Sequence, residues 1–175
     1  MMEIKNYAAD ETLKNGRRVT IRAIRPTDRD ELVAALKELD DQSLYRRFFS
    51  MKKNFSEKEL KAATEVDFDR VVALVTCLPE QEDGKLIGGC RYAVFDNPDM
   101  AEVAFTVRKG YHGLGLGGLM FKRLAGIAKD RGIKALCAEV LSENTPMLKV
   151  FKRGGFPIKF KQESGVTHVT MSLTG

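Results

Sequence analysis

The spacing of apolar residues changes several times along the chain, and each change predicts a new element. Residues 17–26 (RRVTIRAIRP) alternate apolar and charged side chains, which is typical of a half-buried strand. In residues 26–39 the apolar side chains recur at helical spacing, with acidic residues near the start, as in a helix that begins close to Thr27. The chain is therefore expected to open with a strand followed by a helix.

Two further short helices are predicted before the spacing returns to that of strands. One covers residues 41–49, and the other covers 56–66, where Ser56 and Glu59 have the spacing of a capping box. Three strand-like runs follow at 70–78, 85–95 and 100–107. Because the links between them are short, we expect an antiparallel meander.

The second half alternates helices and strands. A helix is predicted at 115–131, ended by Gly132. The elements expected after it are a strand at 133–141, a helix at 143–155, and a closing pair of strands at 156–160 and 166–173. The expected fold class is α+β: one domain over residues 1–175 with a mixed sheet, in which residues 1–16 form a loosely ordered lead-in.

Composition narrows the function only a little. The 175 residues include 43% apolar side chains, enough for one core, and a net charge of +5 is compatible with an anionic ligand or with an ordinary surface. Three cysteines without a C-x-x-C pair and two distant histidines predict neither disulfides nor a metal site. No apolar leader or membrane-length run is present, so we expect a soluble, cytoplasmic protein without a membrane partner.

One segment combines basic and aromatic residues in the manner of a nucleic-acid-binding surface. In residues 45–49 (YRRFF), however, the aromatic residues have the spacing of a buried helical stripe, with Arg46 and Arg47 in solvent. We therefore expect no nucleic-acid partner.

The most informative segment is 110–118, where five of nine residues are glycine and a helix follows. Residues 113–118 (GLGLGG) match the dinucleotide fingerprint G-x-G-x-x-G, but five residues separate the preceding strand from Gly113 and the strands before it form a meander. A simple turn would account for one or two glycines only. The third interpretation is a helix N-terminus cleared of side chains to bind a large anion such as a diphosphate.

On this interpretation the segment 112–117 (HGLGLG) resembles the acyl-CoA-binding signature of the GNAT acetyltransferase superfamily. The resemblance continues through the meander to residues 139–156 (EVLSENTPMLKVFKRGGF) and covers nearly the whole chain. The segments AEVAFTV, SENTPML and RAIRPTD are most similar to the acetyltransferase domain of bacterial protein lysine acetyltransferases that act on acetyl-CoA synthetase. The resemblance implies a GNAT-like fold, acetyl-CoA as co-substrate, and transfer of the acetyl group to a primary amine, with a protein lysine favoured.

The resemblance also implies a set of cofactor contacts. The backbone around Phe105, Thr106 and Val107 would polarise the thioester carbonyl, and Asn144 would lie near the pantetheine arm. The expected cofactor-binding residues are Phe105, Thr106, Val107, His112, Gly113, Leu114, Gly115, Leu116, Gly117, Gly118, Asn144 and Phe151. Two residues depart from the family pattern: His112 replaces glutamine or arginine, and Phe151 replaces a tyrosine that would protonate the leaving thiolate.

Acetyl transfer to a lysine requires a base, because that amine is protonated at neutral pH. Glu102, on the strand leading to the glycine loop, is the candidate, and the resemblance implies the same role for it. Glu139 on the next strand is the alternative, with Asp67 and Asp69 as more distant options. A small-amine acetyltransferase, a non-catalytic acyl-CoA sensor and, more remotely, a dinucleotide enzyme stay open at this point.

Overall fold

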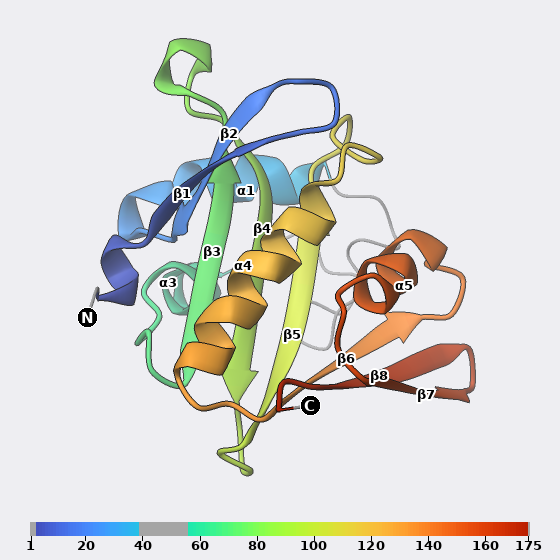
Figure 1. Cartoon of the computed structure of the whole chain (residues 1–175). Helices are drawn as coiled ribbons and strands as arrows, with labels where there is room; N and C mark the ends of the chain where they lie inside the picture. Colours follow the sequence, from blue (N-terminus) through green and yellow to red (C-terminus); the bar gives the residue numbers. More distant parts are fainter. Residues whose placement is uncertain (1–2, 39–55, 175) are drawn as a thin grey trace.

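The structure is a computed structural model, and it describes residues 3–38 and 56–174. The strands in these ranges form one sheet in the order β1-β2-β3-β4-β5-β6-β8-β7 (Figure 1). They are β1 (Ala8–Thr12), β2 (Arg18–Ala23), β3 (Val71–Cys77), β4 (Leu86–Val94), β5 (Met100–Val107), β6 (Ala135–Leu141), β7 (Ile158–Glu163) and β8 (Val166–Ser172). All neighbouring strands are antiparallel except β5 and β6, which confirms the predicted mixed sheet.

Helices cover both faces of the sheet (Figure 1). The α-helices in the described ranges are α1 (Arg29–Lys37), α3 (Glu57–Thr64), α4 (Leu116–Asp130) and α5 (Thr145–Lys152). Helices α4 and α5 pack on one face, where the larger core contains Phe105, Met120 and Phe151. Helix α1 and the segment after α3 cover the other face over a smaller apolar cluster around Ala73 and Val75.

Local sequence signals account for several helix ends. The capping box predicted for α3 is present: the Ser56 hydroxyl accepts the Glu59 N–H, and the Glu59 carboxylate accepts the Ser56 N–H, both at 3.2 Å. Helix α4 ends as predicted before Gly132, which has a φ of +86°. These ends agree with the pattern of the sequence.

The first residues differ from the expectation of a loosely ordered lead-in. Residues Ala8–Thr12 form β1, which pairs with β2 from Ala8↔Arg22 to Thr12↔Arg18. The strand was missed because its sequence, AADET, shows no apolar alternation and its side chains are at most half-buried. The helix predicted at 41–49 lies outside the described residues.

Two further properties concern only the part of the chain that the structure describes. No helix there is long and apolar enough to cross a membrane. No group of three His, Cys, Asp or Glu side chains in the same ranges is arranged to hold a metal ion.

Candidate active site

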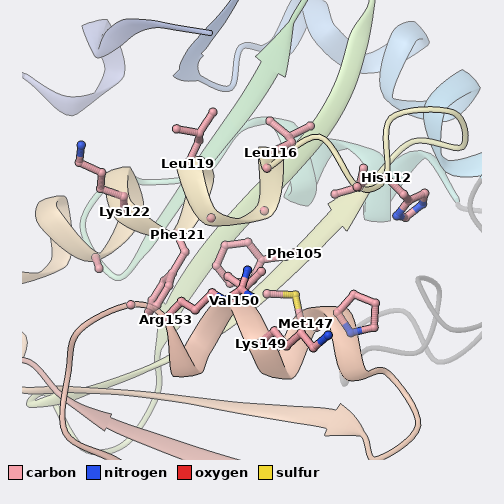
Figure 2. A pocket seen from close by; sticks show the side chains of 18 of the residues that line it. Phe105, His112, Leu116, Leu119, Phe121, Lys122, Met147, Lys149, Val150 and Arg153 are labelled. Atoms are coloured by element: carbon pink, nitrogen blue, oxygen red, sulfur yellow. The ribbon is translucent and has the colours of Figure 1, made fainter. Parts of the chain in front are cut away.

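A cavity of about 730 Å³ lies between α4 and α5, at the edge of β5 (Figure 2). Apolar side chains from both helices form its walls, among them Leu119, Met147 and Val150. The glycine loop closes one end of the cavity. An elongated ligand with an apolar middle section would fit between the two helices.

The glycine loop leads directly into α4. Gly113 and Gly115 have φ values of +76° and +83°, in the left-handed region that favours glycine, and Gly115 is the N-cap. The N–H of Leu119 donates to the Gly115 carbonyl at 3.1 Å, which is the first bond of the helix. The N–H groups of residues 116–118 precede that bond, so they have no acceptor within the helix and give its end a partial positive charge.

The next two glycines keep the end of the helix accessible. A Cβ on Gly118 would meet no atom within 4 Å, and Gly118 lines the cavity, so any side chain there would project into the ligand's space. A Cβ on Gly117 would lie 3.3 Å from Cγ2 of Val150 on α5. The loop therefore forms a cradle that fits a diphosphate, as the sequence predicts.

Basic side chains line the cavity along both helices. The cavity is lined by Lys14, Lys122, Lys129, Lys149 and Arg153, and the described lining residues include no carboxylate. Figure 2 shows Lys122 on α4, Lys149 on α5 and Arg153 directly after α5. Cations beside a helix N-terminus and an apolar wall match the phosphates and the pantetheine arm of a coenzyme A thioester.

Nine of the twelve predicted cofactor residues line this cavity. They are Phe105, Val107, His112, Gly113, Gly115, Leu116, Gly117, Gly118 and Asn144. Asn144 also caps α5, because its side chain accepts the Met147 N–H at 3.3 Å. Asn144 therefore both caps α5 and lines the cavity.

Three predicted residues are not on the cavity wall. Thr106 points to the opposite face of the sheet, where its hydroxyl is 3.4 Å from the Gly89 carbonyl. Leu114 packs against the core, and its carbonyl accepts the Lys14 N–H. Phe151 is buried, with its ring centroid 5.8 Å from that of Phe105 and 5.4 Å from that of Phe121, so it supports the wall from behind.

The strands β5 and β6 separate beside the cavity (Figure 1). Only three positions pair, ending with Glu102↔Cys137, although β5 continues to Val107 and β6 to Leu141. The gap between the strands begins at Glu102.

Backbone donors point into this gap. The Arg108 N–H donates to the Ile87 carbonyl of β4 at 2.8 Å. Because backbone N–H groups alternate between the two edges of a strand, those of Phe105 and Val107 point away from β4. This is the orientation that the resemblance implies for donors to the thioester carbonyl.

Glu102 is 7% exposed, and its side chain shares a sheet face with Ala104 and Thr106. Its surroundings are more polar than the sequence suggests, because Arg91 on β4 pairs with Ala104 and is therefore its diagonal neighbour. Burial lowers the pKa of the Arg91 guanidinium. The carboxylate thus lies at the start of the gap, on the side opposite the cavity.

The alternative carboxylates have other contacts. Glu139 lies two residues beyond Cys137 on the same face, with Oε1 3.6 Å from Nδ1 of His168. Asp67 holds the start of β3, two strands away from β5 in the sheet. Burial opposes its ionisation, but the N–H groups of Asp69 and Val71 bond its carboxylate, and the net effect lowers its pKa. Glu139 is therefore the closer competitor of Glu102.

Sequence reasoning missed the contribution of the first hairpin. Lys14, between β1 and β2, lines the cavity, yet it falls in the segment expected to be a loose lead-in. The sequence did contain a signal for this hairpin. Asn-Gly is typical of a hairpin turn next to a strand with alternating apolar residues, and Asn15-Gly16 directly precedes β2, which has that alternation. The cations on α4 and α5 carried no such signal, because isolated surface lysines are common in helices.

Comparison with known proteins supports the resemblance seen in the sequence. Residues 18–157 match the family model described as an acetyltransferase (GNAT) domain. The GNAT domain of PAT from S. lividans has a TM-score of 0.82 and 31% identity, covering 94% of this chain and 96% of that one. An acetyltransferase from Salmonella typhimurium, solved with its cofactor acetyl-CoA, shares the fold at a TM-score of 0.72 and 16% identity, with 89% and 94% of the two chains covered.

Two relatives of known sequence are also acetyltransferases. An acetyltransferase of Pseudomonas aeruginosa is 27% identical over 137 residues, which are 78% of this chain and 74% of that protein. Acetyltransferase Pat of Mycolicibacterium smegmatis is 32% identical over 145 residues, or 82% of this chain. That region is only 42% of Pat, so the chain spans less than half of this relative.

Proposed function

The chain belongs to the GNAT acetyltransferase family and is an acetyl-CoA-dependent N-acetyltransferase, and from this premise we propose that it acetylates lysine side chains of proteins with Glu102 as the general base. The observation that carries the proposal is the position of Glu102 at the last paired residue before β5 and β6 separate. A carboxylate there lies where the pairing of the two strands ends, on the sheet face opposite the cavity.

The two substrates approach from opposite sides of the sheet in this proposal. Acetyl-CoA lies between α4 and α5, with its thioester in the gap and its carbonyl oxygen near the N–H groups of Phe105 and Val107. The acceptor amine enters from the face that carries Glu102. This arrangement lets the amine reach the carbonyl carbon without displacing the cofactor.

The chemical step is direct transfer. The neutral amine attacks the thioester carbon, a C–N bond forms, and the C–S bond breaks as the thiolate leaves. Glu102 takes the proton that the amine must lose, directly or through one water. A donor in the oxyanion position contributes about 3–4 kcal/mol in other acyl transfers.

The leaving group does not require a dedicated acid. Phe151 occupies the place of the family's tyrosine and is buried behind the cavity wall, so it has no proton to give. A thiol with a pKa of about 8.5 leaves as the thiolate at neutral pH at a cost of about 2 kcal/mol. The thiolate can then take a proton from water.

The proposal of a protein acceptor rests on similarity to protein lysine acetyltransferases and not on a pocket for the acceptor. The segments AEVAFTV and SENTPML resemble protein lysine acetyltransferases, and the identity to the S. lividans PAT domain is 31% over nearly the whole chain. Glu102 and Glu139 are carboxylates on the same sheet face, where either could take a proton from an amine. A small amine has the same reactive group and is the competing acceptor.

The test is the Glu102→Gln variant, assayed by thiol release with lysine peptides and with polyamines. We expect kcat to fall by about 10²–10⁴-fold, the usual contribution of a general base, with little change in acetyl-CoA affinity. Raising the pH should recover part of the loss, because more acceptor amine is then neutral. Greater turnover of peptides than of polyamines by the parent supports the lysine acceptor.

Glu139→Gln is the matched control, because it removes a carboxylate from the same face on the neighbouring strand. It should retain most of the activity. Full activity of Glu102→Gln with loss in Glu139→Gln would transfer the role of base to Glu139. Tight acetyl-CoA binding by the parent without acetylation of any amine would favour the non-catalytic sensor.

A further inference from the structure

The hairpin between β1 and β2 packs directly on the glycine loop. Figure 1 shows its tip beside the segment that enters α4. The backbone N–H of Lys14 donates to the Leu114 carbonyl at 3.0 Å, and the adjacent Leu13 is 2% exposed within the main core. The backbone of Lys14 is therefore fixed against the loop that forms the diphosphate cradle.

The side chain of Lys14 lies across Gly115. Its Cε, Cγ and Cδ atoms are 3.3, 3.4 and 3.6 Å from the position that a Cβ on Gly115 would take. Gly115 is the N-cap of α4, so the lysine stem occupies the space left by the missing side chain. Since Nζ is one bond beyond Cε, this packing holds the ammonium close to the positive end of the helix.

The other side of the hairpin is also tied to its surroundings. The Arg17 guanidinium lies 5.8 Å from the ring centroid of Tyr111, just before the glycine loop, and 2.6 Å from a carboxylate oxygen of Glu82. The Leu13 N–H donates to the Arg17 carbonyl at 2.8 Å and closes the turn. Lys14 is thus presented by a hairpin that is anchored on both arms.

The positive charge of the Lys14 ammonium needs an explanation in this position. Placing an ammonium beside the unused N–H groups of a helix is unfavourable unless an anion lies between them. No carboxylate pairs with Lys14 among the ion pairs of the described residues, and Lys14 lines the cavity.

We propose that Lys14 is a diphosphate-binding residue of the acetyl-CoA site, contributed by the N-terminal hairpin. Its ammonium and the N–H groups of residues 116–118 hold the diphosphate from two sides. The inference rests on acetyl-CoA dependence and not on the acceptor or on the role of Glu102, so the two tests can fail separately.

The test compares the acetyl-CoA Kd of the full chain with those of Lys14→Met and Lys14→Arg by calorimetry. Methionine keeps the unbranched stem over Gly115 and removes the charge, so we expect a Kd about tenfold higher. Arginine should stay within about threefold of the parent. The effect of Lys14→Met should shrink as sodium chloride is raised, because the lost interaction is electrostatic.

Lys109→Met is the matched control. Lys109 is an exposed lysine at the start of the same loop that does not line the cavity, so its removal changes the net charge equally. Its Kd should stay within about twofold of the parent. An unchanged Kd in Lys14→Met, a loss equal to that of the control, or an equal loss in Lys14→Arg would each overturn the proposal.

Discussion

At position 118 a hydrogen atom stands where any other residue would place a side chain in the cavity. The same residue is the third of the helix, where a carboxylate usually stabilises the N-terminus. Helix stability therefore favours a carboxylate at this position, whereas binding of an anionic ligand favours glycine. The glycine is explained by the ligand, because the helix itself would gain from aspartate.

This opposition gives a prediction for Gly118→Asp. We expect acetyl-CoA affinity to fall at least about 100-fold, since a carboxylate about 4 Å from a phosphate costs about 4 kcal/mol at an effective dielectric of 20. The melting temperature should stay the same or rise slightly. Calorimetry and thermal denaturation measure the two effects separately.

Gly118→Asn separates charge from bulk, because asparagine has the same size without the charge. It should bind acetyl-CoA more tightly than the aspartate variant and more weakly than the parent. If Gly118→Asp bound acetyl-CoA as well as the parent, the cradle at the start of α4 would not be the diphosphate site.

Cysteine reactivity gives a second prediction at the residue scale. Burial raises the pKa of the Cys90 thiol, which packs near the Met120 carbonyl, whereas Cys137 is half-buried at the start of the β5–β6 gap. A raised pKa leaves less thiolate at a given pH, so Cys90 should be the slower to alkylate.

Treatment of the native protein with iodoacetamide at pH 8, followed by mass spectrometry, measures the order of modification. We expect Cys137 to be labelled before Cys90, and the difference to disappear in urea. Labelling of Cys90 first in the native state would contradict the burial described here.

At the scale of elements, three aromatic rings join α4, α5 and β5. The ring of Phe121 on α4 lies 6.0 Å from that of Phe105 on β5 and 5.4 Å from that of Phe151 on α5, both edge-on. A Cβ on Gly154 would come within 2.5 Å of the Phe121 ring, so the chain after α5 also closes on it. These contacts set the distance between the two walls of the cavity.

Phe121→Ala should therefore lower the free energy of unfolding by about 3–5 kcal/mol, the usual cost of removing a buried aromatic ring. Phe121 is 2% exposed, whereas Phe160 on β7 is 41% exposed, so Phe160→Ala is the control and should cost less than about 1 kcal/mol. Urea denaturation measures both. Similar losses in the two variants would contradict a central role for Phe121.

The elements also show how far sequence reasoning could go. Strong periodic patterns and caps predicted α3, α4 and the meander, and the glycine loop predicted the cradle. β1 was missed because a polar edge strand carries no alternation, although Asn15-Gly16 marked its turn. The orientation of Phe151 was not predictable, since burial behind a wall depends on rings that are distant in sequence.

At the scale of the whole molecule, the sheet separates the two halves of the proposed site. The cofactor cavity lies on the α4 and α5 face, and Glu102 is on the face covered in part by α1 and α3. The sequence predicted both Glu102 and the glycine loop but not that they lie on opposite faces. Alternation along β5 puts Glu102 with Ala104 and Thr106 on one face, whereas α4 packs against Phe105 on the other.

The short pairing of β5 with β6 has a mechanical consequence. Within the sheet, only three residue pairs join the five strands β1–β5 to the three strands β6–β8, and the rings of Phe105, Phe121 and Phe151 add the packing of α5 on α4 and β5. A ligand that contacts both helices adds to this packing, and its binding energy stabilises the folded arrangement of α4 and α5. The cavity thus lies where the pairing within the sheet is shortest, and bound co-substrate should stabilise the folded protein at that place.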